Sequence, residues 1–391
     1  MTILPETKFY IFHHMTNPNI PEDYEGPAWV ELPARLYDRE TWYKLSQRYI
    51  AEMVLAEQLG FDGLVVNEHH ASAFTINSDP TIMAASLIAR TERVKICVWG
   101  TPPVFDLPHR LAETYATLDV LSHGRLEVAI PLGTPMDYYA NPINPVTGRE
   151  RLQEALDIIL RGWTEDEPFR YEGKYYNYKN VNVWPKPYQQ PHPKIYMVGT
   201  GSPETIEIAA QRGFGYASAF NSIAIQNACV KQLRERAPVY GNTMRPDQFP
   251  LLIMVNITDD EEEAIADYEP HIRYHFAVAG RVGRYANAPG YMSIDSFRKR
   301  AGNAVPRTLG GFNWEELATQ FRVVAGTPAT VIRKVEEWAQ ELGSNLVVFH
   351  PHCGNMPHWK VVRNMTKLAD EVLPVLRERQ FEAAATRAAA E

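Results

Sequence analysis

Short runs of apolar and β-branched residues alternate along the chain with longer stretches whose apolar residues recur every three or four positions. The short runs predict strands and the longer stretches predict amphipathic helices. Strands are expected at 8–13, 63–67, 94–99, 125–130, 194–199, 216–220, 250–257 and 345–350. Helices are expected at 39–60, 79–91, 108–122, 147–166, 202–212, 222–237, 259–279, 328–342 and 358–379.

A helix between consecutive strands implies a parallel sheet, because parallel neighbours need long crossover connections. The count of eight strands, without a dinucleotide fingerprint after the first one, favours a closed (β/α)8 TIM barrel over an open doubly wound sheet. We therefore expect one α/β domain of this kind over residues 1–391, a length that the barrel reaches when its loops carry insertions.

Two segments interrupt the alternation, after the fourth and the seventh predicted strand. Residues 167–193 are rich in Tyr, Pro and Asn, and the run YEGKYYNY predicts a surface hairpin. Residues 282–325 are long for a connection within one domain, and loops of that length are usually lids or disordered segments. The cluster Arg298-Lys299-Arg300 fits a mobile cover over a site, and a solvated basic surface explains it equally well.

Charge and cysteine content narrow the possible partners. The formal net charge of −8 argues against nucleic acid or an anionic membrane, because either is bound by a basic face. Cys97, Cys229 and Cys353 lie far apart, which fits neither a disulfide framework nor a zinc cluster. The first residues lack a signal-peptide pattern, and no stretch approaches the roughly 20 apolar residues of a membrane span. We expect a cytoplasmic protein that acts on a small molecule.

Candidate chemistry gathers where the predicted strands end, as it does in (β/α)8 barrels. The second strand is followed by Glu68-His69-His70, which can supply a general acid or base. Because neighbouring side chains of an extended segment alternate, the two histidines should face different ways. His69 is the better candidate for catalysis. In the alternative interpretation, one histidine points into the barrel while the other pairs with Glu68 or caps the next helix.

The end of the fifth strand reads VGTGSPET and opens a helix. Glu204 occupies the position of the third glycine in a dinucleotide fingerprint, so that motif is absent. Gly201 and Ser202 expose backbone N–H groups at the helix start, and Thr205 adds a hydroxyl, which suits one phosphate group. Alternatively, Ser202 only caps the helix. Glu204 would repel a bound phosphate unless its side chain points away.

His350 and His352 are two positions apart on the last strand and could both bind a metal ion, together with Glu68, His69 and Asp119. A metal-dependent hydrolase is therefore an alternative from another enzyme class. Pro351 restricts this segment, so we expect no metal and place His350 in a substrate pocket instead. Tyr138 and Trp99 lie near strand ends and can line an apolar pocket, although aromatic residues are more often core.

Several segments resemble the bacterial luciferase-like monooxygenase family, in family order. They are GFDGLVVNEHH at 60–70, LPHRLAETYATLDVLSHGRLEVAI at 107–130, RLQEALDIILRGW at 151–163, VGTGSPETIEIAAQRGFG at 198–215 and GTPATVIRKVEEWAQELGSNLVVF at 326–349. The resemblance implies a TIM barrel, usually a homodimer, that uses reduced FMN delivered by a separate NAD(P)H:flavin reductase. In one branch of the family the deazaflavin F420 replaces FMN, and we keep an F420-dependent oxidoreductase as an alternative.

The resemblance also assigns roles to residues. Glu68-His69-His70 is similar to the family's Glu-His-His, in which the first histidine acts in catalysis, so we take His69 and Glu68 as the catalytic candidates. Gly201, Ser202 and Thr205 match the segment that holds the flavin phosphate. Trp99-Gly100 falls near a non-prolyl cis peptide beside the flavin ring. The expected reaction oxygenates a small, apolar or aromatic substrate through a flavin C4a-(hydro)peroxide.

This chain departs from the luciferases at the end of the fourth strand. There the luciferases carry an arginine that reaches the FMN phosphate, and this chain has Leu132. We therefore expect a basic group from elsewhere, with Arg151 as the candidate, and loose binding of reduced flavin.

Overall fold

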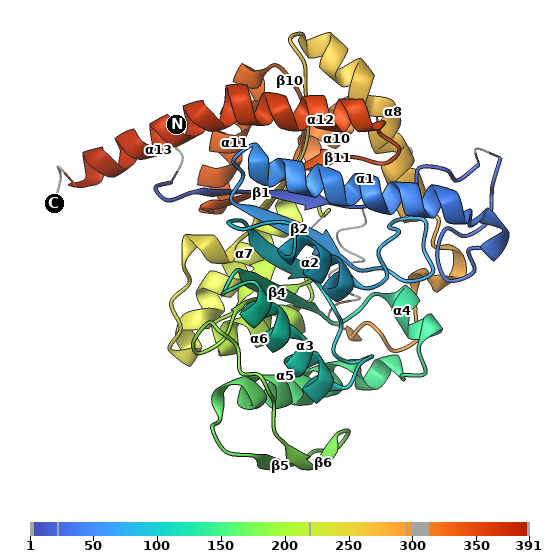
Figure 1. The fold of residues 1–391 in the computed structure, drawn as a ribbon, viewed down its shortest axis with the longest axis vertical. Helices are drawn as coiled ribbons and strands as arrows, with labels where there is room; N and C mark the ends of the chain where they lie inside the picture. Colours follow the sequence, from blue (N-terminus) through green and yellow to red (C-terminus); the bar gives the residue numbers. More distant parts are fainter. Residues whose placement is uncertain are drawn as a thin grey trace.

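A parallel sheet occupies the middle of the computed structural model, and helices surround it (Figure 1). The structure describes residues 4–21, 23–218, 220–294, 296, 298 and 313–388. Its strands are β1 (Lys8–His13), β2 (Gly63–Asn67), β3 (Lys95–Trp99), β4 (Leu126–Pro131), β5 (Phe169–Glu172), β6 (Asn177–Val181), β7 (Lys194–Val198), β8 (Gly215–Ala217), β9 (Leu251–Ile257), β10 (Val323–Gly326) and β11 (Leu346–His352).

The helices follow the predicted periodicity closely. They are α1 (Arg39–Gln58), α2 (Pro80–Ile88), α3 (Pro108–Leu121), α4 (Pro135–Ala140), α5 (Gly148–Thr164), α6 (Pro203–Arg212), α7 (Ile223–Arg236), α8 (Glu261–Gly280), α10 (Trp314–Gln320), α11 (Pro328–Leu342), α12 (His358–Lys367) and α13 (Leu373–Ala388). The short helix α4 was not expected, and α13 extends past the predicted end of the last helix at residue 379. None of the described helices is long and apolar enough to cross a membrane.

Nine strands form the main sheet in the order β10-β9-β11-β1-β2-β3-β4-β7-β8, and every neighbouring pair is parallel. All eight predicted strands are present, which confirms the α/β fold. The ninth, β10, lies within the segment 282–325 that was expected to be an insertion. It pairs with the end of β9, and its four residues are too few to show a period in the sequence.

The sheet is strongly curved. The Tyr10 hydroxyl on β1 donates to Glu127 Oε1 on β4 at 3.2 Å, although two strands lie between them. In a flat sheet, strands three positions apart are separated by about 14 Å. Curvature therefore brings the inner faces together, as the barrel prediction requires. Among the described residues, no ladder joins β8 to β10 or β9.

Alternation along the strands creates two apolar layers. Tyr10 and Phe12 of β1 contact the inner side chains of the other strands. Phe9 and Ile11 of the same strand face outward and pack with the helices. This separation decides on which side of the sheet each residue at a strand end lies.

The first predicted excursion is a hairpin, as expected. Strands β5 and β6 are antiparallel and project beyond α5 (Figure 1). The Glu154 carboxylate on α5 accepts the backbone N–H groups of Lys174, Tyr175 and Tyr176 at 2.8–3.1 Å, which fixes the hairpin to the helix. In the second excursion, Lys299 and Arg300 of the basic cluster lie outside the described residues, so the expected lid stays a prediction.

Candidate active site

Glu68 and His70 form a pair just past β2. His70 Nε2 lies 2.8 Å from Glu68 Oε1. The Glu68 side chain is buried, and this burial raises its pKa, whereas the hydrogen bond to Glu68 raises the pKa of the exposed His70. The pairing with Glu68 that the sequence left open thus belongs to His70, and the two histidines do face different ways.

His69 points toward an aromatic surface instead of a charge. Its ring centroid lies 4.9 Å from that of Trp29, 5.3 Å from that of Phe74 and 6.2 Å from that of His14. Burial, aided by the nearby His70, lowers its pKa to about 3. At neutral pH, His69 is therefore an uncharged imidazole that can accept or donate one hydrogen bond.

Three further histidines, which we call the inner histidine cluster, lie on the inner side of the sheet next to His69. They are His14 after β1, His275 on α8 and His350 on β11. Each is 0% exposed, and the ring centroids are 4.9 Å (14–275), 5.8 Å (14–350) and 5.6 Å (275–350) apart. Neither ring nitrogen of any of the three has a hydrogen-bond partner among the described residues. The sequence analysis had singled out only His350.

A second group, the outer histidine cluster, lies between the sheet and helices α1 and α12. It consists of His13, Glu52 and His352 together with Arg48 and His358. Glu52 contacts His13 Nε2 at 2.6 Å, and its other oxygen contacts Arg48 Nε and His358 Nδ1, each at 2.7 Å. The rings of His13 and His352 stack at 4.4 Å.

The backbone of β11 separates His350 from His352. Ile11 pairs with Phe349 but His13 pairs with His352, so β11 contains one extra residue at this point. Such a bulge reverses the side that later residues face. The two histidines therefore lie in different clusters, and the premise that both ligate one metal as neighbours on a strand is wrong. Asp119 on α3, another residue of the expected metal site, is buried and accepts two hydrogen bonds from Gln189.

His13, Glu52 and His352 present ligand atoms within 4.8 Å of one another, a spacing that a metal ion could use. The hydrogen bonds argue against it. The Met15 backbone N–H donates to His13 Nδ1 at 3.1 Å, so the proton of this neutral imidazole is on Nε2. Nε2 then donates to the Glu52 carboxylate and has no lone pair for a metal.

The Trp99–Gly100 peptide bond is cis, as the resemblance led us to expect at this place. A Cβ at position 100 would lie 1.6 Å from the Ala129 carbonyl oxygen, so only glycine fits against β4. The indole Nε1 of Trp99 is buried without a hydrogen-bond partner in the described chain. A cofactor or substrate that brings an acceptor to this edge would satisfy it.

The start of α6 already carries a negative charge, the carboxylate of Glu204. Gly201 adopts a φ of +97°, and Ser202 donates from Oγ to Glu204 Oε2 at 2.6 Å instead of capping the helix. Ser296 Oγ donates to the same carboxylate oxygen at 3.0 Å. Although burial opposes it, hydrogen bonds with Ser202 and Ser293 and the charge of Arg149 lower the pKa of Glu204 to about 2. The Glu204 carboxylate thus points into the expected phosphate position.

Two arginines of α5 point in different directions. The Arg149 Nε lies 3.9 Å from Glu204 Oε2, is buried and has no hydrogen-bond partner among the described residues. The Arg151 guanidinium lies over the Tyr175 ring at 4.6 Å and donates to Thr147 Oγ1 at 3.2 Å. The structure therefore places Arg149, which the sequence analysis missed, beside the α6 start, and it places Arg151 toward the hairpin.

Tyr138 on α4 closes the side of the site near β4. Its hydroxyl donates to the Leu132 carbonyl at 3.1 Å, and its ring contacts Phe105 at 4.8 Å. Gly148 lets this ring approach, because a Cβ there would lie 2.1 Å from the hydroxyl. Tyr138 therefore packs next to Leu132, where the luciferases have arginine, and its place in a substrate pocket stays a prediction.

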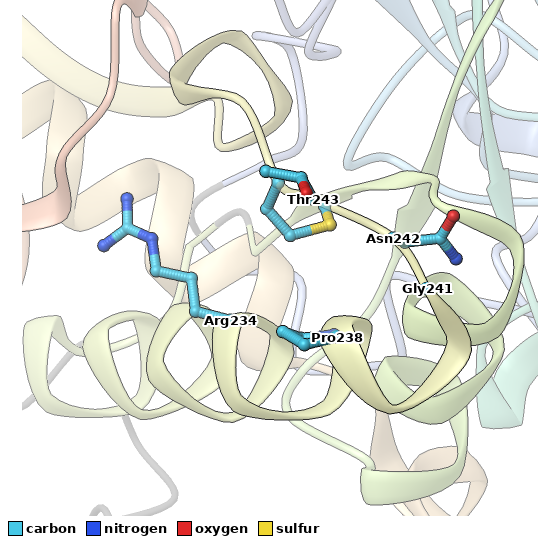
Figure 2. A pocket seen from close by; sticks show the side chains of 6 residues that line it. Arg234, Pro238, Gly241, Asn242 and Thr243 are labelled. Atoms are coloured by element: carbon cyan, nitrogen blue, oxygen red, sulfur yellow. The ribbon is translucent and has the colours of Figure 1, made fainter.

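Two surface hollows lie away from the inner histidine cluster and the start of α6. One, of about 410 Å³, follows α7 at the edge where strands begin, with Arg234 at one side and Asn242 at the other (Figure 2). The other, of about 390 Å³, lies between α1 and α12, and Arg48 and His358 of the outer cluster line it. The outer cluster thus faces solvent, whereas the inner cluster does not.

Comparison with known proteins identifies a matching family and two relatives of this chain. The family described as luciferase-like monooxygenase matches residues 36–345. The oxygenase component of a flavin-dependent trigonelline monooxygenase from Acinetobacter baylyi is 29% identical over 182 residues, 46% of this chain and 50% of that protein. An F420-dependent glucose-6-phosphate dehydrogenase from Microbacterium testaceum is 32% identical over 172 residues, 42% of this chain and 49% of that protein. The chain thus spans about half the length of these relatives.

The fold has close counterparts among solved structures. The oxygenating constituent of 3,6-diketocamphane monooxygenase from Pseudomonas putida, solved in complex with FMN, superposes with a TM-score of 0.70 at 19% identity, covering 96% of this chain and 99% of that one. At this identity the likeness concerns the fold alone.

Proposed function

This chain belongs to the luciferase-like monooxygenase family, and on that premise we propose that it oxygenates a small organic molecule with reduced FMN and dioxygen. Reduced flavin supplies two electrons, so that one oxygen atom enters the substrate and the other leaves as water. The groups that would hold the flavin lie at the carboxyl edge of the sheet, from Trp99-Gly100 to the start of α6.

The observation that carries this proposal is the buried Arg149 Nε without a hydrogen-bond partner beside Gly201 and Ser202. A buried N–H donor without an acceptor is costly, whereas Nη1 of the same guanidinium already donates to the Tyr291 carbonyl at 2.8 Å. A phosphate at the N-terminus of the ten-residue helix α6 would accept from Arg149, from Ser202 and from backbone N–H groups. We assign Arg149 this role in place of the expected Arg151, together with Ser202 and Thr205. The expected Gly201 shapes the turn instead, because its N–H already donates to the Tyr216 hydroxyl at 3.0 Å.

Glu204 must leave for the phosphate to bind, because two anions cannot share the serine hydroxyls and the arginine. This competition supports loose cofactor binding, in line with a flavin that arrives reduced. The trigonelline relative is named as an oxygenase component, which supports delivery of reduced FMN by a separate reductase. A homodimer is part of the proposal as well, because the resemblance to the family implies it.

His69 and Glu68 are the proposed catalytic pair. The neutral His69 can hydrogen-bond the reacting oxygen or take a proton from the substrate at one ring nitrogen. Glu68, with its raised pKa and its partner His70, can exchange a proton at the same edge.

Flavin titration tests the proposal. Anaerobic titration of reduced FMN should show saturable binding that Arg149→Ala weakens roughly 10- to 100-fold, the range of one charge-assisted hydrogen bond. Arg151→Ala is the matched control from the same helix and should bind FMN as the wild type does. Riboflavin, which lacks the phosphate, should bind both variants equally. Equal FMN binding by all three proteins would remove the phosphate site at α6.

The same titration decides the second candidate, an F420-dependent oxidoreductase, which the relative from Microbacterium testaceum favours. Tight binding of F420 with no binding of reduced FMN would support it. In the proposed function, reduced FMN binds and ¹⁸O from labelled dioxygen appears in the product. His69→Ala should then abolish oxygen incorporation while FMN binding persists.

A further inference from the structure

The inner histidine cluster is built as an incomplete hydrogen-bonding site. His14, His275 and His350 come from three separate elements and are 0% exposed, yet none of their ring nitrogens has a partner in the described part of the chain. Each unpartnered buried polar group costs about 1–3 kcal/mol. Three together at the edge where barrel sites lie point to a ligand that completes them.

The charge state of the cluster restricts the ligand. Burial lowers the pKa of His275 to about 3, and it lowers the pKa values of His14 and His350 well below that of a free histidine. All three rings are therefore neutral near pH 7. A neutral imidazole offers one N–H donor and one lone pair. With no ion pair reaching these rings from the described residues, a carboxylate or an ammonium group would lose its hydration without a counter-ion. A hydroxyl, which both donates and accepts, matches this set.

The surroundings of the cluster are aromatic. The His14 ring meets Phe74 at 3.9 Å and Phe220 at 5.4 Å, and the His350 ring meets Phe12 at 5.2 Å. His69, the proposed catalytic histidine, is 6.2 Å from His14. Edge-to-face contacts of this kind favour a flat aromatic ring as the body of the ligand.

A metal does not fit this place as well as a hydroxyl does. Among the described residues, His13, Glu52 and His352 are the only group of three or more that brings ligand atoms within 4.8 Å of one another. The three histidines of the inner cluster do not meet this spacing, which argues against a shared metal ion.

We propose that His14, His275 and His350 select an uncharged aromatic substrate that carries a hydroxyl group, such as a phenol. This substrate class rests on the proposed monooxygenase function, whose site it shares. The three imidazoles are binding residues, and they hold the hydroxyl next to His69.

Binding of small probes tests the proposal without turnover. Calorimetric titrations would use p-cresol as the uncharged phenol, toluene as the analogue without the hydroxyl and benzoate as the anion. We expect p-cresol to bind at least about tenfold more tightly than either, the factor for one net hydrogen bond. Toluene binding as tightly as p-cresol, or benzoate binding more tightly, would overturn the proposal.

Variants of the inner cluster test which histidines bind the hydroxyl group. His275→Phe and His350→Phe keep a ring and remove the nitrogens, and each should weaken p-cresol about tenfold while toluene is unaffected. His352→Phe is the matched control, because His352 is equally buried and unpartnered but belongs to the outer cluster. If a Phe variant fails to fold, ring ¹⁵N NMR of the wild type replaces it. Adding p-cresol should shift the ring signals of the inner cluster, and unchanged signals would contradict the proposal.

The outcome of the p-cresol titrations can be distinguished from the outcome of the flavin titration. If reduced FMN binds and oxygen is incorporated into other molecules, but phenols do not bind, the substrate class is wrong and the function stands. If p-cresol binds through the inner cluster but no flavin binds, the site stands and the monooxygenase is wrong. Stoichiometric zinc that His350→Phe abolishes would overturn the phenol site.

Discussion

The inner and outer histidine clusters lie at the same edge of the sheet, but only the outer one reaches solvent, through Arg48 and His358, and the two differ in their partners. In the outer cluster, Glu52 contacts His13, Arg48 and His358. In the inner cluster, no carboxylate or other hydrogen-bond partner from the described residues reaches the rings. His13 and His14 are neighbours in sequence but belong to different clusters. Burial alone therefore does not separate the clusters. The Glu52 carboxylate holds the outer one together, although its His352 has no hydrogen-bond partner among the described residues, and no such carboxylate reaches the inner one.

The largest expected effect is on the outer cluster. Glu52→Ala should lower the free energy of unfolding by about 3–5 kcal/mol, because it leaves buried polar groups without their shared partner. Urea unfolding followed by circular dichroism measures it. His358→Ala is the control within the same cluster, since this side chain is 55% exposed, and it should cost under about 1 kcal/mol. A Glu52→Ala cost as small as that of the control would mean that the outer cluster is not structural.

A second comparison gives opposite results for two buried histidines. His13→Phe should destabilise the fold by about 2–3 kcal/mol, because Glu52 loses a hydrogen bond in a buried place. His350→Phe removes nitrogens that have no partner, so the free energy of unfolding should stay within about 1 kcal/mol of the wild type or rise. The same urea series measures both, and equal losses would erase the distinction between the clusters.

The pH dependence of stability sharpens the contrast. His275 has a folded pKa of about 3, below the value of about 6.5 of an unfolded histidine. The unfolded state therefore binds the proton first. Stability is fully present above pH 6.5 and falls as the pH drops toward 3, by about 1.4 kcal/mol per pH unit. Urea unfolding of His275→Phe between pH 6 and 4.5 should show a slope smaller by this amount, and parallel curves would contradict a neutral buried His275.

The smallest expected effect concerns Glu204. Its carboxylate accepts the hydrogen bonds at the start of α6, as the Glu52 carboxylate does in the outer cluster. Glu204→Gln should strengthen reduced FMN binding about fivefold, since the competing charge is worth about 1 kcal/mol at a partly exposed place. Riboflavin should bind unchanged, because it brings no phosphate. Fluorescence titration measures both ligands, and a gain for riboflavin as large as that for FMN would show that Glu204 acts on the ring instead.

Local patterns in the sequence predicted most of the elements and part of the site. The periodicity placed eight of the nine strands of the main sheet and most of the helices between them. The position directly after β2 marked Glu68 and His69 as site candidates. His14 was missed although it directly follows the predicted strand 8–13, the same signal that marked Glu68 and His69, and His275 was missed because nothing near it in sequence looks like a motif. One follows a strand directly, and the other lies within a helix as an ordinary buried position. Arg149 was passed over for Arg151 because residues two apart on a helix face different ways, and the sequence does not say which way each faces.

The sequence by itself determined the alternating α/β pattern, the family resemblance and the residues at the strand ends, because these depend on local periodicity and spacing. Only the tertiary structure decided how the strand-end residues are grouped. The extra residue in β11 placed His350 and His352 on opposite sides of the sheet, and curvature brought His14, His275 and His350 together. The direction of Glu204 was decided in the same way, by Arg149 and Ser296. Such contacts depend on backbone irregularities and on residues far apart in the chain, which no local pattern encodes.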